Sequence, residues 1–286
     1  MAQKILVSFC VGSAFLLSAC AQGTTEAEVE RALKSVNVID ESNLNHVMLN
    51  ATDPNEAVSY FRRASAENPD RIDLRRGLGV SLMRAGFTTE SASVLSQVVA
   101  SDQSTPDDRV TLSEAYIRGG NWPRAEQELD QIPPTYETFD RYRLEAMVAD
   151  SNEEWQKADS FYEIALGLTT KPSGVLNNWG YSKLSRGQYK DAERLFGEAL
   201  THDTNLFTAK NNLVLARGAQ RNYELPVVQM DQIERAQLLH TLGLAAVKQG
   251  DVTIGKGLLR DAVETHPQHF EAASTSLKAL EANVAN

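Results

Sequence analysis

The chain has 286 residues, of which 42% are hydrophobic and 23% charged, so its composition is that of a folded protein. It carries 28 Lys and Arg against 38 Asp and Glu, which gives a net charge of −10. Sequence-independent binding of nucleic acid needs clustered Lys and Arg, so an acidic chain without basic runs argues against that function. We therefore expect no nucleic-acid partner.

The first predicted element is a secretory signal peptide over residues 1–19. Lys4 precedes an apolar run over residues 5–17. That run is too short to span a membrane as an ordinary helix, which needs about 20 residues. It ends in the letters LSAC at residues 17–20. This tetrapeptide resembles the bacterial lipoprotein signal, in which an apolar residue and two small residues precede a lipid-modified cysteine.

The resemblance implies that the thiol of Cys20 receives a diacylglycerol, that cleavage occurs just before it, and that its new amino group is acylated. Cys10 lies in the removed segment, so the mature chain would have neither a free thiol nor a disulfide. The next residues, Ala21 and Gln22, include no Asp, which implies the outer membrane, facing the periplasm. An ordinary signal peptide with a chance cysteine is the alternative. The lipidated cysteine and the polar residues after it, 20–37, are predicted to form a tether.

Residues 38–286 are predicted to form an array of helical repeats. A small residue recurs at intervals of 34, 34, 33 and 34 residues, with a large apolar residue four positions after each one. A small or β-branched residue stands three positions further on, and these spacings place all three on one helix face. A fixed period near 34 residues indicates a solenoid. The recurring small residues are Ala57, Ser91, Ala125, Ala158 and Ala192.

The pattern resembles the tetratricopeptide repeat, a pair of antiparallel helices. It implies an all-α fold, an α-solenoid of about seven helix-turn-helix repeats with a C-terminal capping helix. In this family small residues mark close helix packing, which would offset the helix-propensity cost of Gly180, about 1 kcal/mol. Gly187 is expected to end the same helix. The expected copies are 38–71, 72–105, 106–138, 139–172, 173–206, 207–235 and 236–269, followed by a closing helix over 270–283.

The sixth copy, about 207–235, is expected to be degenerate. Pro226 stands where the small residue of the second helix belongs. Proline lacks a backbone N–H and clashes with the preceding turn, so it cannot sit inside a helix. The second helix of this copy is therefore predicted to be short or missing.

The sequence offers no catalytic or metal-binding motif. The segment GDVTIGKG, residues 250–257, nearly matches a phosphate-binding loop, but Gly257 takes the position of the metal-binding hydroxyl and no strand pattern precedes it. His266 and His269 flank Pro267 at a predicted helix end, without a third ligand nearby. We therefore predict no enzyme, no catalytic residue, no metal, no cofactor and no small-molecule substrate.

The family resemblance implies instead that the first helices of the repeats line a concave groove that binds a protein partner. Asn177 and Asn211 occupy a family position at which asparagine can hydrogen-bond a peptide backbone, although the asparagine that follows each is also an ordinary consensus residue. Arg76 and Val80 stand where the chaperone-binding carboxylate clamp needs Lys and Asn. The candidate groove residues are Arg76, Met83, Arg84, Glu114, Arg118, Arg143, Asn177, Asn178, Tyr181, Asn211 and Asn212.

The lipoprotein signal, the tether and the repeats together resemble the layout of the TadD family of lipoproteins from tight-adherence (Flp) pilus systems. This resemblance implies a pilotin-like scaffold, held at the outer membrane by its lipid, that helps a secretin to localise or multimerise. The expected partner is then a secretin or another pilus assembly subunit. The alternative is a repeat lipoprotein that serves as an adaptor of β-barrel assembly or of peptidoglycan enzymes.

Overall fold

A computed structural model of the chain describes residues 44–282 and divides the chain into two units, Met1–Asp53 and Pro54–Asn286. The expected signal peptide, Cys20 and the tether lie outside the described residues. In the first unit, residues 44–50 are helical. Over the described range 44–282, no helix combines the length and the apolar character that crossing a bilayer requires.

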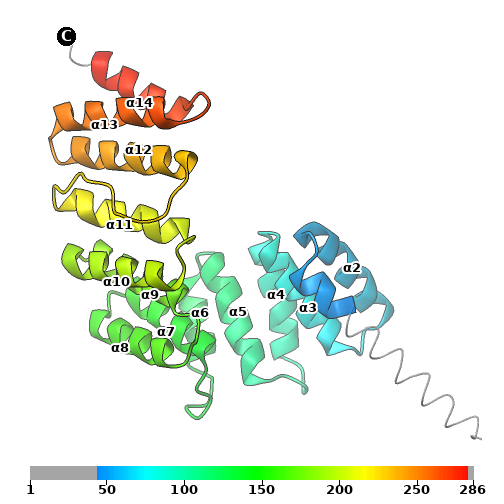
Figure 1. The fold of residues 1–286 in the computed structure, drawn as a ribbon. Coiled ribbons are helices and arrows are strands. Elements are labelled where there is room, and N and C mark those ends of the chain that lie inside the picture. Colours follow the sequence, from blue (N-terminus) through cyan, green and yellow to red (C-terminus); the bar gives the residue numbers. More distant parts are fainter. Residues whose placement is uncertain (1–43, 283–286) are drawn as a thin grey trace, which may run out of the picture. The chain divides into compact units, whose positions relative to one another are not determined.

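The described residues of the second unit form helices joined by short turns and contain no strand, and the helices follow one another in chain order (Figure 1). The helices are α2 (Pro54–Glu67), α3 (Ile72–Arg84), α4 (Thr88–Val99), α5 (Pro106–Arg118), α6 (Trp122–Leu129), α7 (Phe139–Ser151), α8 (Trp155–Gly167), α9 (Ser173–Ser185), α10 (Tyr189–His202), α11 (Phe207–Ala219), α12 (Gln232–Lys248), α13 (Val252–Thr265) and α14 (Glu271–Ala282).

Each helix packs against the next one along the chain, as expected for a solenoid. The first helices of successive pairs also contact one another: α3 contacts α5, α5 contacts α7, α7 contacts α9, and α9 contacts α11. One surface of the array is therefore lined by first helices. The predicted fold class, an all-α solenoid of tetratricopeptide type, is confirmed.

The turns that follow the first helices share one backbone conformation. Gly187 comes just after α9 with φ of +74°, in the left-handed region that suits glycine at a helix end. Two of these turns lack glycine, and there a bulkier residue holds the same conformation, at about 1–2 kcal/mol per residue. The residues with positive φ are Gly86, Gly120, Glu153, Gly187, Arg221 and Gly250.

The small residues of the first helices lie against the large residues of the second helices. A Cβ added at Gly180 would lie 2.6 Å from Cε1 of Phe196, and one added at Gly79 would lie 2.5 Å from Cδ2 of Leu95. Both large side chains are almost fully buried. The close packing that the sequence predicts for Gly180 is therefore present in the structure.

We expect Gly180→Ala to lower the free energy of unfolding by about 1–3 kcal/mol, because the new methyl group must displace the buried ring of Phe196. Gly197 on α10 is a matched control, since a Cβ there has nothing within 4 Å. Gly197→Ala should raise the free energy of unfolding by about 0.5–1 kcal/mol through helix propensity. Urea titration followed by circular dichroism measures both changes, and equal effects at the two sites would contradict the packing argument.

Between α11 and α12, residues 220–231 form no helix, and α12 packs directly on α11. Pro226 lies in this segment, which agrees with its expected effect on a helix. Tyr223 is one of the half-buried side chains that cover the apolar cluster between the two helices. The segment is also tied down by Asp251, which pairs with Arg221 at 3.0 Å and accepts a hydrogen bond from the Tyr223 hydroxyl.

A buried ion pair joins the same two helices. Lys210 on α11 is only 1% exposed, and its Nζ lies 2.8 Å from Oε2 of Glu234 on α12. Glu234 also completes a capping box with Asp231 at the start of α12. One carboxylate thus neutralises a buried ammonium group and secures the first turn of α12.

Candidate peptide-binding groove

A groove of about 510 Å³ lies on the face that the first helices line. Three consecutive first helices, α7, α9 and α11, supply most of its side chains. The first residues of α6 and α8 supply one tryptophan each, and α8 also supplies Tyr162. Its lining residues are Trp122, Met147, Asp150, Ser151, Trp155, Tyr162, Asn177, Asn178, Tyr181, Ser182, Ser185, Phe207, Thr208, Asn211 and Asn212.

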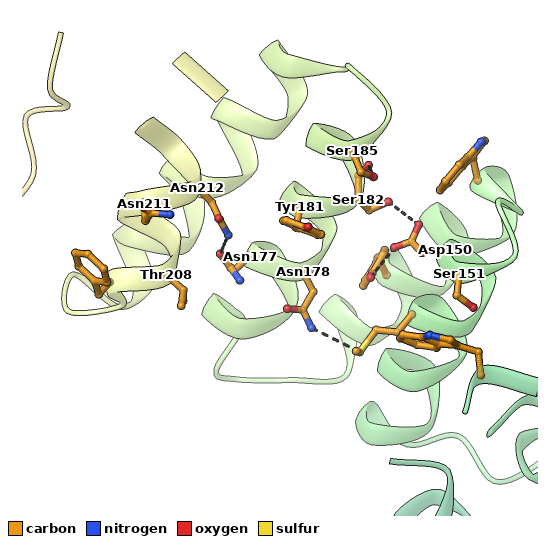
Figure 2. A pocket seen from close by; sticks show the side chains of 15 residues that line it. Asp150, Ser151, Asn177, Asn178, Tyr181, Ser182, Ser185, Thr208, Asn211 and Asn212 are labelled. Atoms are coloured by element: carbon orange, nitrogen blue, oxygen red, sulfur yellow. Dashed lines mark hydrogen bonds between the residues drawn. The ribbon is translucent and has the colours of Figure 1, made fainter. Parts of the chain in front are cut away.

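The groove brings together five of the predicted residues: the four asparagines and Tyr181 (Figure 2). The Nδ2 of Asn212 donates to Oδ1 of Asn177 at 3.1 Å, and Asn211 Oδ1 accepts from a threonine on α12 at 2.8 Å. The Nδ2 of Asn178 contacts only a methionine sulfur, at 3.8 Å. Each side-chain amide therefore keeps at least one polar atom that has no hydrogen bond to the described residues.

The other predicted residues lie outside this groove, on α3, α5 and α7. Arg76 pairs with Asp108 at 2.6 Å. Met83 packs in an apolar core cluster and is 8% exposed, so it presents little surface to a ligand. Arg84 is exposed in the last turn of α3.

Glu114 joins the remaining two predicted residues. It pairs with Arg118 at 2.8 Å and with Arg143 at 3.2 Å, and Arg143 also reaches Asp140 at 3.3 Å. In these ion pairs the opposite charges of α5 and α7 neutralise each other. Most of the charged residues that the sequence assigned to the groove therefore form ion pairs outside it, whereas the groove itself is largely neutral.

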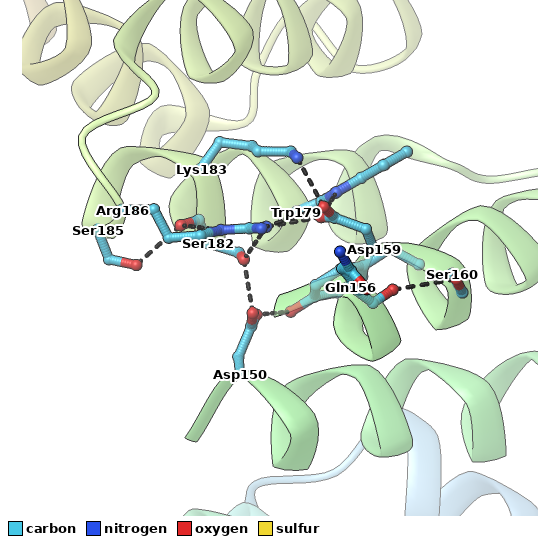
Figure 3. A network of polar contacts seen from close by, with 10 residues as sticks. Asp150, Gln156, Asp159, Ser160, Trp179, Ser182, Lys183, Ser185 and Arg186 are labelled. Carbon is cyan, nitrogen blue, oxygen red and sulfur yellow. Dashed lines mark hydrogen bonds and ion pairs between the residues drawn. The ribbon is translucent and has the colours of Figure 1, made fainter. Parts of the chain in front are cut away.

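Asp150 is the one acidic or basic side chain among those that line the groove. Its carboxylate accepts hydrogen bonds from the Tyr162 hydroxyl at 2.8 Å and from Ser182 Oγ at 2.6 Å (Figure 3). Both donors are neutral. Burial raises the pKa of Asp150, and this outweighs the opposite effect of the two hydrogen bonds.

A second carboxylate, Asp159 on α8, ties α8 to α9 and is not among the residues that line the groove (Figure 3). It accepts hydrogen bonds from Arg186 at 2.6 Å, from Lys183 at 2.8 Å and from the Trp179 indole at 2.7 Å. Burial alone would raise the pKa of Asp159, but these three donors outweigh it and lower the pKa to about 2. Arg186 also donates to Ser182 at 2.8 Å, so the network fixes a groove residue.

Apart from Tyr181, sequence reasoning missed the aromatic side chains of the groove, which are Trp122, Trp155, Tyr162 and Phe207. Trp122 and Trp155 are the first residues of second helices, and Phe207 is the first residue of α11. One sequence signal could have found the two tryptophans: each stands at the same position of its repeat, just after the turn between the two helices. The prediction assigned the groove to positions along the first helices alone, and it therefore omitted side chains that reach the same face from helix ends.

The structure also shows where the two weak motifs lie. Most of the GDVTIGKG segment is helical, since α13 begins at Val252, so it forms no phosphate-binding loop. His266 and His269 lie at the end of α13 and just before α14, and His269 Nε2 contacts Glu271 at 2.6 Å. Within residues 44–282, His, Cys, Asp and Glu form no group of three or more that could hold a metal ion.

A family profile described as Tetratricopeptide repeat matches residues 48–108. None of the curated proteins matches the chain. The repeat match and the stacked helix pairs together define a tetratricopeptide-repeat scaffold, a fold class that typically serves protein interaction.

Several solved structures are similar to the chain. A chain of the APC/C hetero-tetramer Cut9–Hcn1 has a TM-score of 0.61 at 13% identity, over 82% of this chain and 48% of that one. Human IFIT1, solved as a dimer with m7Gppp-AAAA, has a TM-score of 0.59 at 15% identity, over 90% and 69%. A tetratricopeptide repeat protein from Parabacteroides merdae has a TM-score of 0.55 at 14% identity, over 88% and 98%.

The chain spans about half the length of the Cut9–Hcn1 chain that it matches. At these identities the similarity shows a common fold and carries no information on partners.

Proposed function

We propose that this protein is a scaffold that binds an extended peptide segment of a partner protein in the groove between α7, α9 and α11. The observation that carries the proposal is the groove itself, which is largely neutral and is lined by aromatic side chains and a row of asparagine amides. Peptide-binding sites of this type combine apolar pockets with polar groups that recognise the main chain.

The asparagines suit an extended main chain because a side-chain amide offers both a donor and an acceptor. Asn178 and Asn212 are 34 residues apart, one repeat from the next. Their Oδ1 atoms have no hydrogen bond to the described residues, and the same holds for Nδ2 of Asn177 and Asn211. These atoms match the alternating N–H and C=O groups of a peptide.

Tyr181 should be a main contributor to binding, because it lines the groove and yet is 58% exposed without a ligand. We expect Tyr181→Ala to weaken peptide binding at least tenfold while leaving the unfolding midpoint unchanged, as for an aromatic interface residue. Tyr189 is a matched control, since it is partly exposed on α10 and does not line the groove. Calorimetric titration with selected peptides measures both variants, and equal affinities would contradict the proposal.

We further propose a location and a partner for this scaffold. Lipidation at Cys20 would hold it on the outer membrane, facing the periplasm, where it would act as a pilotin-like assembly factor for the secretin of a tight-adherence pilus. The support is the sequence LSAC at residues 17–20 and the layout that resembles the TadD family. A membrane anchor raises the effective concentration of the groove for a membrane-bound partner, which is what assembly requires.

Two measurements test this part of the proposal. Cys20→Ser should abolish palmitate incorporation and move the protein from the outer-membrane fraction to the soluble periplasmic fraction. Deletion of the gene should abolish secretin multimers, and the Tyr181→Ala variant should restore them poorly although it remains anchored. Unaltered secretin multimers combined with defects in β-barrel insertion or cell shape would favour the adaptor function instead.

A further inference from the structure

We propose that the groove contains a subsite for a basic side chain, a Lys or Arg of the bound segment, formed by Asp150 together with Trp122 and Trp155. This inference rests on the proposed peptide-binding function and names the chemistry of the partner. It follows from the charge of the lining residues, the partners of Asp150 and the position of the two indoles.

Asp150 forms no ion pair with the described residues, and the one cation whose charge acts on it, Arg186, pairs with Asp159. Its two hydrogen-bond donors are the neutral hydroxyls of Tyr162 and Ser182, each on a different carboxylate oxygen. Two arginines of this region are engaged elsewhere: Arg186 holds Asp159 through two hydrogen bonds, and Arg143 pairs with acidic residues on α5 and α7. A carboxylate oxygen accepts more than one hydrogen bond, so Asp150 can take a further donor from the groove side.

An incoming cation is the donor that suits this position best. A partly buried anion whose direct hydrogen-bond donors are both neutral gains more from a cationic donor than from another hydroxyl, because charge-assisted hydrogen bonds are roughly twice as strong. No lining residue of the groove carries a positive charge, and Arg186, which lies over the ring of Trp155, is neutralised by Asp159. The net charge of the chain, −10, also favours the approach of a basic segment.

The two tryptophans reinforce this preference. Trp122 and Trp155 line the same groove as Asp150, and indole is the aromatic ring that attracts cations most strongly. Trp155 already shows this behaviour within the protein, since the guanidinium carbon of Arg186 lies 5.2 Å from its ring centroid. The aliphatic stem of a Lys or Arg would pack on apolar groove surface while its charged end reaches Asp150.

The test uses displayed peptides. Random dodecapeptides would be selected on the purified full chain, and the tightest binder would be synthesised with both ends capped. We expect it to contain a Lys or Arg whose replacement by acetyl-lysine or citrulline raises Kd at least tenfold. Asp150→Asn should reduce that ratio to less than threefold, with an unfolding midpoint close to that of the wild type.

A second measurement does not depend on the variant. A photoactivatable residue placed next to the basic residue of the peptide should label residues 150–155 of the wild-type protein. If Tyr181→Ala weakens the peptide but neutralising its basic residues changes Kd less than threefold, the subsite is refuted and the groove remains. Labelling elsewhere would also refute the subsite. If no peptide is selected at all, the proposed function fails, and the subsite with it.

Discussion

Replacing Glu234 by Gln should destabilise the C-terminal helices α12 to α14 by about 3–5 kcal/mol, because it leaves Lys210 as an uncompensated buried charge. Lys210 is 1% exposed, and Glu234, at 2.8 Å, is the one partner of its ammonium group among the described residues. Glutamine can still complete the capping box at the start of α12. The lost stability would therefore come from the missing charge and not from a missing helix cap.

The effect should be local, because stability in a repeat array depends on contacts between neighbouring elements. The three tryptophans of the chain, Trp122, Trp155 and Trp179, all precede α11, so their fluorescence reports the N-terminal part. Circular dichroism reports every helix. In Glu234→Gln, urea titration should therefore show an early dichroism transition for α12–α14 and a fluorescence transition close to that of the wild type.

A double variant is the control for this prediction. Lys210→Met combined with Glu234→Gln removes both charges and leaves side chains of similar size, so most of the lost stability should return. If the single Glu234→Gln variant unfolds like the wild type by both probes, the ion pair does not hold α12 to α11. If the double variant is as unstable as the single one, packing rather than charge is responsible.

Replacing Asp159 by Asn should destabilise the α8–α9 pair by about 3 kcal/mol, since it removes the negative charge shared by two largely buried cations, Lys183 and Arg186. Arg186 is 7% exposed, whereas Asp159 is 29% exposed, so the loss falls at the low end for a buried pair. Glu198→Gln is a control on the adjacent helix α10, where the Arg194–Glu198 pair is exposed and is worth about 0.5 kcal/mol. Tryptophan fluorescence during urea titration measures both variants.

Acid provides an independent check on Asp159. Its pKa lies at about 2 in the folded chain against an ordinary value of 3.8, so the stability it contributes is present above pH 3.8 and is lost as the pH falls towards 2. The difference in free energy of unfolding between the wild type and Asp159→Asn should therefore become smaller as the pH falls from 3.8 to 2. The stability that Asp150 contributes changes with pH in the opposite direction. Its pKa is raised in the folded chain, so this contribution is lost as the pH rises. If the difference in free energy of unfolding between the two proteins stayed constant from pH 5 to pH 2, the stabilising role of Asp159 would be contradicted.

The sequence was sufficient to predict the fold because each repeat uses the same packing rule. A small residue on the first helix must face a large one on the second, so pairs such as Gly180 and Phe196 recur with a visible period. The residue types at the turns after the first helices vary more, although the backbone conformation is the same. Glu153 and Arg221 hold a left-handed conformation that glycine would predict, and no residue type in the sequence marks it.

The candidate site was predicted in part. The asparagines and Tyr181 follow from their repeat positions, since residues one period apart on stacked first helices must lie side by side. The charged candidates do not line the groove, because arginines such as Arg76 and Arg143 pair with acidic residues on the neighbouring first helix. Such pairing depends on side-chain reach across neighbouring helices, and the repeat period contains no information about it.

The segment that replaces the second helix between α11 and α12 also has a mechanical consequence. In a stack of repeats each unit contacts only its neighbours, so a pull on the C-terminal helices is carried across this junction by the α11–α12 interface and by the chain that crosses it. A turn-rich strap crosses here in place of a helix. Asp251 holds the strap, and the buried ion pair between Lys210 and Glu234 joins the two helices. A partner that pulled on α12 to α14 would therefore load these two polar contacts.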